Sequence, residues 1–217
     1  MKKKKWILMV AVLMMVFAGV MPVQAASAKW KKACQAYKTY LAKNESHYVP
    51  KRTTYWYTAN SEKATTLSDF LILDMDKNGV PELIGIHSYG MKNQKLYVFT
   101  YKNGKVTRVK NTKGKSASVE MICSTGTGWP SVYSCTKNHL HIYLSWGSGN
   151  KQYTYVIKNG KLQCYAEYEW NWIENKTTCK VNGKRVSAKK YQSVIKNCRQ
   201  KKCWVTNNKK NRAKYVK

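Results

Sequence analysis

Three of the four Asn-Gly dipeptides in this chain lie between runs of strand-forming residues with period-two spacing, and they constrain its fold more than any other feature. They are Asn103-Gly104, Asn159-Gly160 and Asn182-Gly183. Asn-Gly is a preferred pair for the two-residue type I′ turn, which needs positive φ angles at both central residues and joins neighbouring antiparallel strands. The second dipeptide, for example, lies between Tyr153–Ile157 and Leu162–Tyr165. The chain is therefore predicted to form several hairpins of an antiparallel sheet.

Alternating apolar residues extend this sheet well beyond the three hairpins. Leu71 and Leu73 alternate before an acidic segment, and Leu83, Ile84 and Ile86 follow it. A period of two is typical of strands, so we expect the sheet to cover residues 68–183. A further pair of strands, over residues 132–135 and 140–144, is expected to flank Lys137-Asn138.

Helical spacing is confined to the two ends of the predicted sheet. Trp30, Cys34, Tyr37 and Leu41 recur every three or four residues, which predicts an amphipathic helix over residues 30–48. Ser187 is a suitable N-cap for a second helix over residues 187–200. The predicted fold class is α+β, mainly an antiparallel β-sheet meander with an N-terminal amphipathic helix and a C-terminal helix. We expect a single β-rich domain over residues 26–206, followed by a basic tail over residues 207–217.

The first 25 residues have the pattern of a secretory signal peptide. Lys2–Lys5 precede the apolar run Trp6–Val20, and small residues follow Pro22. An uncleaved membrane anchor is the alternative, but spanning takes about twenty apolar residues and Pro22 interrupts the run early. We expect cleavage after Ala25, secretion of residues 26–217, and association with a cell surface by charge without stable membrane insertion.

The strongly basic composition favours anionic partners. The chain has 40 Lys and Arg residues against 10 Asp and Glu, a formal charge of +30, and removing Lys2–Lys5 with the signal peptide leaves +26. Such a charge attracts cell-wall polymers, acidic glycans, nucleic acid or anionic lipid surfaces. Lysines outnumber arginines and are scattered, which favours diffuse, salt-sensitive attraction over readout of a particular phosphate, so nucleic-acid binding is expected to be non-specific.

Cysteines in an exported chain are candidates for disulfide bonds. All seven follow the predicted cleavage site, and the odd number leaves at least one outside an intramolecular pair. Cys123 with Cys135, and Cys164 with Cys179, are candidate pairs because one turn joins the strands that carry them. Zinc binding is the alternative, but the chain contains no Cys-x-x-Cys pair.

The acidic segment between two predicted strands has the ligand pattern of a calcium loop. Asp74, Asp76 and Asn78 stand at its first, third and fifth positions, and Gly79 at the sixth allows a sharp turn. We expect the Val80 carbonyl and the Glu82 carboxylate to complete a structural Ca²⁺ site. The twelfth position is Gly85, where an EF-hand needs a bidentate Glu, so the loop is not an EF-hand. A solvated turn that binds no ion is the alternative.

The run Asp-x-Asp-x-Asn-Gly-x-Pro-Glu-Leu, from Asp74 to Leu83, resembles the single DxDxDG-type calcium loops of FG-GAP and VCBS-type repeats. Residues 30–200 also resemble uncharacterised exported proteins of Gram-positive bacteria that join one such loop to Lys-Asn-Gly-Lys hairpins and a C-terminal helix. The resemblance implies a Ca²⁺-stabilised, β-rich module and assigns no activity. The sequence departs from the pattern at Asn78, where Asp is usual, and a single copy of the loop cannot build a propeller.

Aromatic and paired polar residues supply the remaining candidate sites. Glu167 and Glu169 share one face of a strand, as do His139 and His141. Salt bridges to lysine and a surface histidine pair are the alternatives to catalytic carboxylates and a shared metal. Tryptophans beside polar loops are a candidate stacking platform for sugars, unless the core buries them. These are Trp129, Trp146, Trp170 and Trp172.

The sequence does not determine a reaction, since it contains none of the common hydrolase, metalloprotease or phosphate-loop motifs. It favours a secreted, non-enzymatic, Ca²⁺-stabilised module that binds anionic surface polymers or glycans. A glycan-acting hydrolase using the paired glutamates is one alternative. A cationic antimicrobial or membrane-active secreted protein is another.

Overall fold

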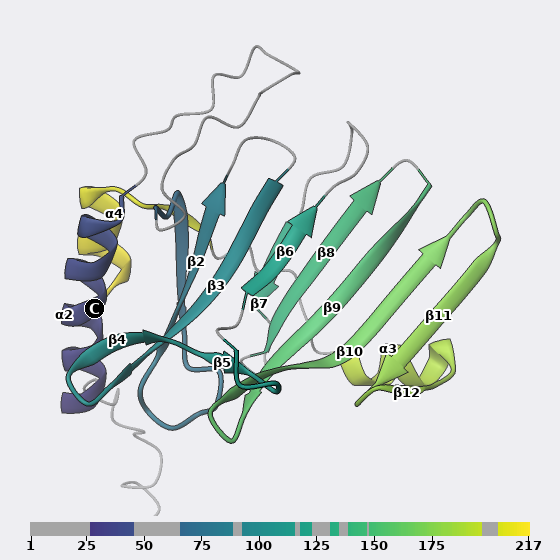
Figure 1. Cartoon of the computed structure of the whole chain (residues 1–217), viewed down its shortest axis with the longest axis horizontal. Helices are drawn as coiled ribbons and strands as arrows, with labels where there is room; N and C mark the ends of the chain where they lie inside the picture. Colours follow the sequence, from purple (N-terminus) through teal and green to yellow (C-terminus); the bar gives the residue numbers. More distant parts are fainter. Residues whose placement is uncertain are drawn as a thin grey trace, which may run out of the picture.

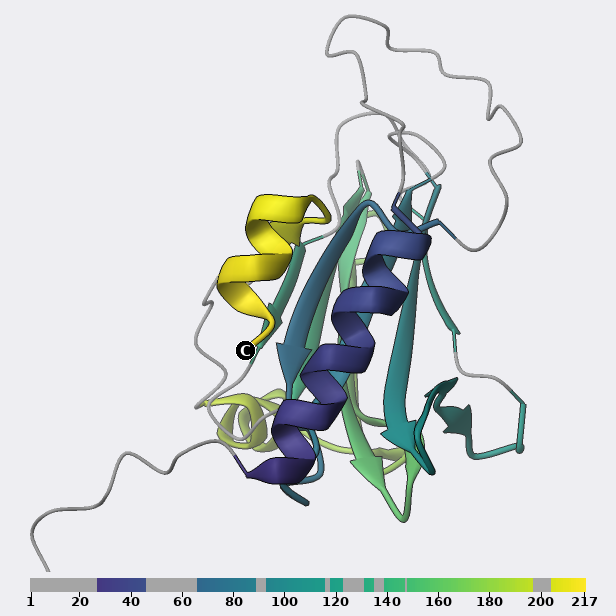
Figure 2. The same ribbon diagram turned by 90° about the vertical axis from the view of Figure 1, so that its left-hand side faces the viewer.

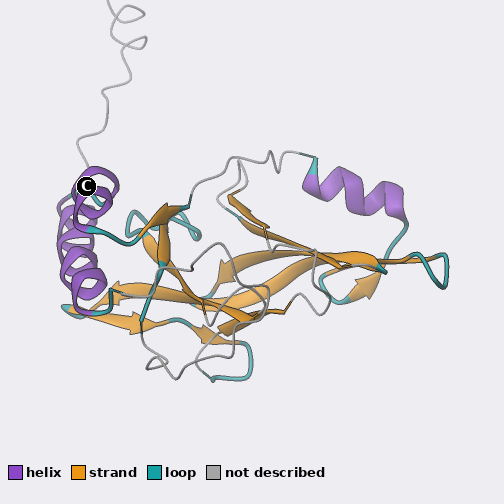
Figure 3. Cartoon of the chain, turned by 90° about the horizontal axis from the view of Figure 1, so that it is seen from above, coloured by secondary structure: helices purple, strands orange, loops and turns teal. Residues whose placement is uncertain are grey.

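The computed structural model describes residues 27–45, 66–88, 93–115, 118–122, 131–134, 139–146, 148–196 and 204–217. The fold is α+β, as predicted, and consists mainly of two antiparallel sheets (Figure 1). Helices lie against the sheets at both ends of the molecule when it is viewed from above (Figure 3). The expected signal peptide lies outside the described residues.

The first sheet has the strand order β13-β1-β2-β3-β4, and β6 also pairs with β3. Its members are β1 (Asp69–Leu73), β2 (Glu82–Ser88), β3 (Asn93–Lys102), β4 (Lys105–Arg108), β6 (Ser118–Ile122) and β13 (Val205–Thr206). Strands β1 to β4 are consecutive antiparallel neighbours, so this part of the sheet is the expected meander.

The second sheet has the order β12-β11-β10-β9-β8-β7 and is a meander of six consecutive strands. Its members are β7 (Ser131–Ser134), β8 (Leu140–Trp146), β9 (Gly149–Lys158), β10 (Lys161–Asn171), β11 (Lys176–Val181) and β12 (Lys184–Arg185). The short β5 (Lys110–Asn111) follows β4 after one residue and pairs with β10 in parallel, so this segment passes from the first sheet to the second.

All three Asn-Gly turns form as predicted. Asn103 has φ 52° and Gly104 has φ 76°, and the other two pairs have similarly positive angles. The residues on either side of each turn pair directly, as Lys102 does with Lys105. The predicted pairing of residues 132–135 with 140–144 is also found, between β7 and β8.

The first sheet is buried on both faces. Ile84 and Val98 face a core shared with β8, β9 and β10 of the second sheet. Leu83 and Phe99, their neighbours along the chain, face helix α2 (Ala28–Lys43). Burial on both faces explains why apolar residues follow one another in β2, where a sheet with one wet face would alternate them with polar residues.

Helix α2 lies across the first sheet, as the amphipathic pattern predicts (Figure 2). Ser27 caps it by accepting a hydrogen bond from the Trp30 amide, and Cys34, Tyr37 and Leu41 are buried. The second predicted helix is α3 (Ala188–Ile195), capped by Ser187 and packed on β10 and β11 through Tyr191. The first helix ends at Lys43, earlier than expected, and Glu45 instead forms a β-bridge with Leu67. The rest of the expected helical residues, 46–48 and 197–200, lie outside the described ranges.

The C-terminal segment differs from the expected basic tail. Val205 pairs with Phe70 of β1, and residues Lys209–Tyr215 form helix α4 beside α2 (Figure 2). Val216 is fully buried in the cluster beneath α2, and the Lys217 carbonyl accepts a hydrogen bond from the Trp30 indole. A single buried valine in a polar segment has no periodic signal, so its docking could not be inferred from hydropathy.

A β-bulge in β10 contradicts the suggested pairing of Cys164 with Cys179. The register shifts between Cys164 and Ala166, so Cys164 stays opposite Tyr155 while Ala166 and Cys179 face α3. Both thiols are free. Cys34 is also free and buried in the core under α2, while the other cysteines lie in residues that the structure does not describe.

Candidate metal site

The acidic loop is set at one end of the first sheet by the pairing of β1 with β2. Leu73, the last residue of β1, pairs with Glu82, the first residue of β2, and residues 74–81 return the chain between them. Lys77 and Gly79 take the left-handed conformation, with φ angles of 60° and 80°. The Lys77 side chain is exposed, so it points away from the sheet.

Hydrogen bonds from backbone N–H groups to carboxylates shape the loop. Asn78 N donates to Asp74 Oδ1 at 3.1 Å and to Asp76 Oδ1 at 3.2 Å, and Gly79 N donates to Asp74 Oδ2 at 3.1 Å. Met75 N donates to Glu82 Oε2 at 2.8 Å across the mouth of the loop. The carboxylates therefore order the turn, and the loop is already formed without a bound cation.

Contacts with α2, its N-cap Ser27 and the core fix the position of the loop. The Tyr37 hydroxyl donates a buried hydrogen bond of 2.7 Å to the Pro81 carbonyl, and Ser27 Oγ donates to the Gly79 carbonyl at 3.4 Å. Met75 is buried in the core between the two sheets. Sequence reasoning missed these anchors: Met75 was recognisable as an apolar residue between two acids, whereas the Tyr37 contact spans 44 residues and has no local signal.

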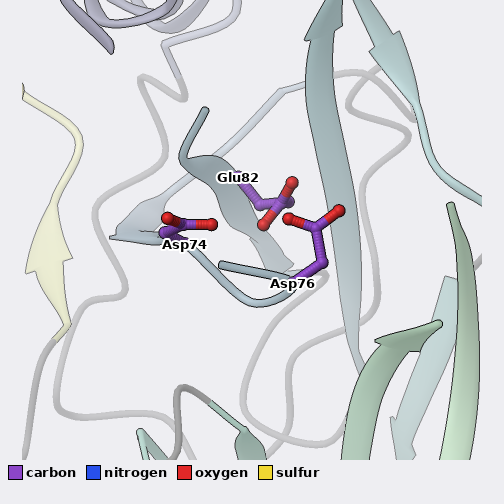
Figure 4. Close-up of side chains that lie close together, drawn as sticks. All are labelled: Asp74, Asp76 and Glu82. Carbon is purple, nitrogen blue, oxygen red and sulfur yellow. The ribbon is translucent and has the colours of Figure 1, made fainter. Parts of the chain in front are cut away.

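Three carboxylates converge at the loop, and Figure 4 shows them pointing toward one another. Ligand oxygens of Asp74, Asp76 and Glu82 all lie within 4.8 Å of one another. Glu82 is only 1% exposed and, within the described residues, takes part in no ion pair. An all-oxygen set of this kind matches the preference of Ca²⁺, a hard cation.

The raised pKa values in the cluster reflect burial first and the crowding of like charges second. Burial, together with the charges of Asp76 and Asp74, raises the pKa of Glu82 to about 8, against the opposing effect of the Met75 N–H. Burial and the Asp74 charge also raise the pKa of Asp76, although Asn78 donates hydrogen bonds to it. A divalent cation would replace this repulsion by attraction and would tie the end of β1 to the start of β2.

Two of the five predicted ligands differ from expectation in their contacts. Asn78 turns its amide nitrogen toward the cluster, donating to Asp76 Oδ2 at 2.8 Å, while its oxygen accepts from Val80 N at 2.7 Å. The observed contact of Val80 with the loop is therefore made by its N–H group, and ligation by its carbonyl stays a prediction. Asp74, Asp76 and Glu82 are the candidate ligands that the fold brings together.

The paired glutamates of β10 are joined to lysines on the neighbouring strands. Glu169 lies 2.8 Å from Lys151 Nζ of β9, and Glu167 lies 3.4 Å from Lys180 Nζ of β11. Each lysine is the direct register partner of its glutamate. This is the salt-bridge alternative raised for these two residues, and it gives both carboxylates a structural partner.

The other candidate residues are dispersed. Trp170, 37% exposed, and Trp172, 53% exposed, lie at the turn from β10 to β11. Trp129 lies outside the described residues, and for Trp146 the structure describes only the backbone at the end of β8. His141 is buried, with Nδ1 at 2.9 Å from Thr154 Oγ1, so the surface histidine pair was wrong for this residue.

Comparison with known proteins does not extend the motif resemblance. The chain matches no protein-family model, no curated protein and no solved structure. Within the described ranges, no helix has both the length and the apolar character needed to cross a membrane. Any function must therefore be argued from the loop and the distribution of charge.

Proposed function

We propose that this protein is an exported, non-enzymatic module that binds anionic surface polymers or glycans and whose fold is stabilised by Ca²⁺ in the 74–82 loop. The observation that carries the proposal is the segregation of charge. Of the few acids described, three gather in the loop, and Glu45, Glu167 and Glu169 are each in an ion pair. Because so few acids remain, most lysine side chains are expected to contact solvent or an external anion.

Support for Ca²⁺ comes from the donor set. The carboxylates of Asp74, Asp76 and Glu82 are close enough to share one ion, and backbone N–H groups already hold all three in place. An ion there would have a structural role because it lies between consecutive strands. We expect the modest affinity typical of extracellular modules, with a dissociation constant on the order of 10⁻⁴ to 10⁻³ M.

Support for an anionic partner comes from exposed lysines that take part in no ion pair among the residues that the structure describes. They include Lys110, Lys158 and Lys161, whereas the described ion pair between the end of α2 and α4 is that of Glu45 with Arg212, at 2.7 Å. An extended positive surface attracts polyanions over distances near the Debye length, about 8 Å at physiological salt. Trp170 and Trp172 add exposed rings on which a sugar could stack.

Retention on immobilised polymers tests this proposal. Oxidised residues 26–217 should bind inorganic polyphosphate and an acidic glycan in 50 mM salt, elute as salt is raised, and ignore neutral dextran as the matched control. Incubation with the same polymers should release no soluble fragments. Equal retention on dextran would contradict charge-driven binding, and fragment release abolished by replacing Glu167 and Glu169 with Gln would favour the glycan-acting hydrolase.

A further inference from the structure

Three exposed lysines form a row across the strands at one end of the second sheet. Lys161 of β10 pairs directly with Lys158 of β9 on one side and with Lys110 of β5 on the other. All three side chains are exposed. Directly paired residues project from the same face of a sheet, so the three lysine side chains extend into solvent next to one another.

The backbone beneath this lysine row is held by the core. Val109 precedes Lys110, Ile157 precedes Lys158 and Leu162 follows Lys161, and these three apolar residues are buried together between the sheets. Since successive strand residues point to opposite faces, burying one set directs the lysines outward. The row is therefore a fixed feature of the fold.

A compact turn places two more lysines next to the row. Residues 112–115 follow β5, and Asn111 Oδ1 accepts hydrogen bonds from the amides of Lys113 and Lys115 at 3.0 and 3.1 Å. Both side chains are exposed. Five lysines thus belong to β5, its following turn and the β9–β10 turn, which gather at the lower edge of the molecule (Figure 1).

Such a row is unfavourable to the protein alone. Like charges directly opposite one another destabilise a sheet. The ion-paired glutamates of β10 lie beyond the bulge at Cys164, where Glu167 and Glu169 already hold Lys180 and Lys151. An external anion would remove the repulsion and would itself be held at several points.

We propose that the lysine row Lys110–Lys161–Lys158, extended by Lys113 and Lys115, is the binding site for a flexible linear polymer of phosphate groups without bases. This rests on the proposed polyanion-binding function and names the surface and the ligand chemistry. Neighbouring strands are about 4.8 Å apart, so the row spans about 10 Å, which suits a few consecutive charges of one extended chain. Compact ammonium groups can hold phosphate oxygens as point charges along a flexible chain, whereas bidentate recognition of one particular phosphate or carboxylate favours arginine.

Nucleic acid fits this surface less well than a polymer without bases. Single-stranded nucleic acid is usually held by stacking on aromatic side chains. The exposed Trp170 lies at the opposite end of β10, nine residues from Lys161, or about 30 Å along the strand. The row thus offers positive charge, and the exposed tryptophans of the described residues lie away from it.

Binding of fluorescent inorganic polyphosphate to the wild type and two triple variants tests the site. The row variant is Lys110→Gln, Lys158→Gln and Lys161→Gln. The control variant is Lys32→Gln, Lys43→Gln and Lys210→Gln, which removes the same charge from exposed positions on α2 and α4. We expect the row variant to bind at least about fivefold more weakly in 50 mM salt and to lose about 2 from the slope of log affinity against log salt, with the control less than about twofold weaker.

The possible outcomes distinguish the lysine row, charge-driven binding in general and the ligand class. Equal weakening of the two variants would overturn the row while leaving charge-driven binding intact, whereas absence of binding by the wild type would overturn both. Tighter binding of duplex DNA, lost in the row variant, would overturn the ligand class. The row variant should also melt at or up to about 4 °C above the wild type in low salt, and a lower melting temperature would contradict the repulsion on which the site is argued.

Discussion

Replacing Glu82 with Gln separates calcium binding from the packing of the loop. The side chain is buried, and its Oε2 accepts the Met75 N–H at 2.8 Å. Glutamine has the same length and keeps an acceptor oxygen for that N–H, while it removes one of three converging charges. Asp74→Ala would be less informative, because Asp74 also accepts the amides of Asn78 and Gly79 and its loss would loosen the turn in any buffer.

The expected effect follows from mass action. With a dissociation constant of about 10⁻⁴ to 10⁻³ M, 10 mM Ca²⁺ stabilises the folded state by about 1.4 to 2.7 kcal/mol. For a domain of this size each kcal/mol shifts the melting temperature by about 2–4 °C, so the wild type should gain about 3–11 °C. Glu82→Gln should lose most of this gain and should melt no lower than the wild type in chelator at pH 7, because the raised pKa of about 8 already leaves the metal-free Glu82 carboxyl mostly uncharged, as glutamine is.

Thermal melts in 10 mM Ca²⁺ and in EGTA measure both quantities. Glu174→Gln is the matched control, since Glu174 is exposed at the β10–β11 turn, outside the loop. It should keep the full calcium shift. A wild type that shows no shift in Ca²⁺, or a Glu82→Gln variant that shows the same shift as the wild type, would refute calcium binding through Glu82.

Two further substitutions test contacts around the loop and the second sheet. Tyr37→Phe removes the buried donor to the Pro81 carbonyl and should lower the free energy of unfolding by about 1–3 kcal/mol in urea titrations; an unchanged midpoint would show that the hydrogen bond contributes nothing. Burial lowers the pKa of His141 below its ordinary 6.5, so the unfolded chain takes up the proton first as pH falls. This contribution to stability is complete above pH 6.5 and declines below it, so wild-type melting temperatures should fall more steeply between pH 7 and pH 5 than those of His141→Gln, and parallel profiles would contradict the shift.

Local signals predicted the elements of this fold well. An Asn-Gly turn depends on the φ angles of its own two residues, and all three such turns form as expected. The spacing of Cys34, Tyr37 and Leu41 likewise predicts a helix with one apolar face, and this face packs on the first sheet. The ligand positions Asp74, Asp76 and Glu82 were recognisable for the same reason, because the loop that unites them is nine residues long.

Features that depend on distant partners were not recoverable from the sequence. The bulge after Cys164 adds one residue to β10, so even-numbered residues after it point to the opposite face of the sheet from those before it. A strict period-two pattern cannot predict such an insertion. The C-terminal helix is fixed by the burial of Val216 and by the Trp30–Lys217 contact, which joins residues 187 positions apart. The lysine row is also a product of register, since Lys110 meets Lys161 only through the β5–β10 pairing.

The loop and the lysine row should influence each other. Met75 lies in the same buried cluster as Val109, Ile157 and Leu162, which underlie the row, and the β1–β2 loop lies at the same end of the molecule as the β9–β10 turn (Figure 1). Ca²⁺ would cancel negative charge in the loop and tie β1 to β2, whose Leu71 and Ile84 belong to the same cluster.

Polyphosphate should therefore bind the wild type more tightly in Ca²⁺ than in chelator at matched ionic strength. Glu82→Gln distinguishes this coupling from Ca²⁺ ions that bridge polymer and protein directly. A calcium effect that disappears in the variant would place its origin in the loop, whereas an effect of equal size in both proteins would show that the loop and the row act independently.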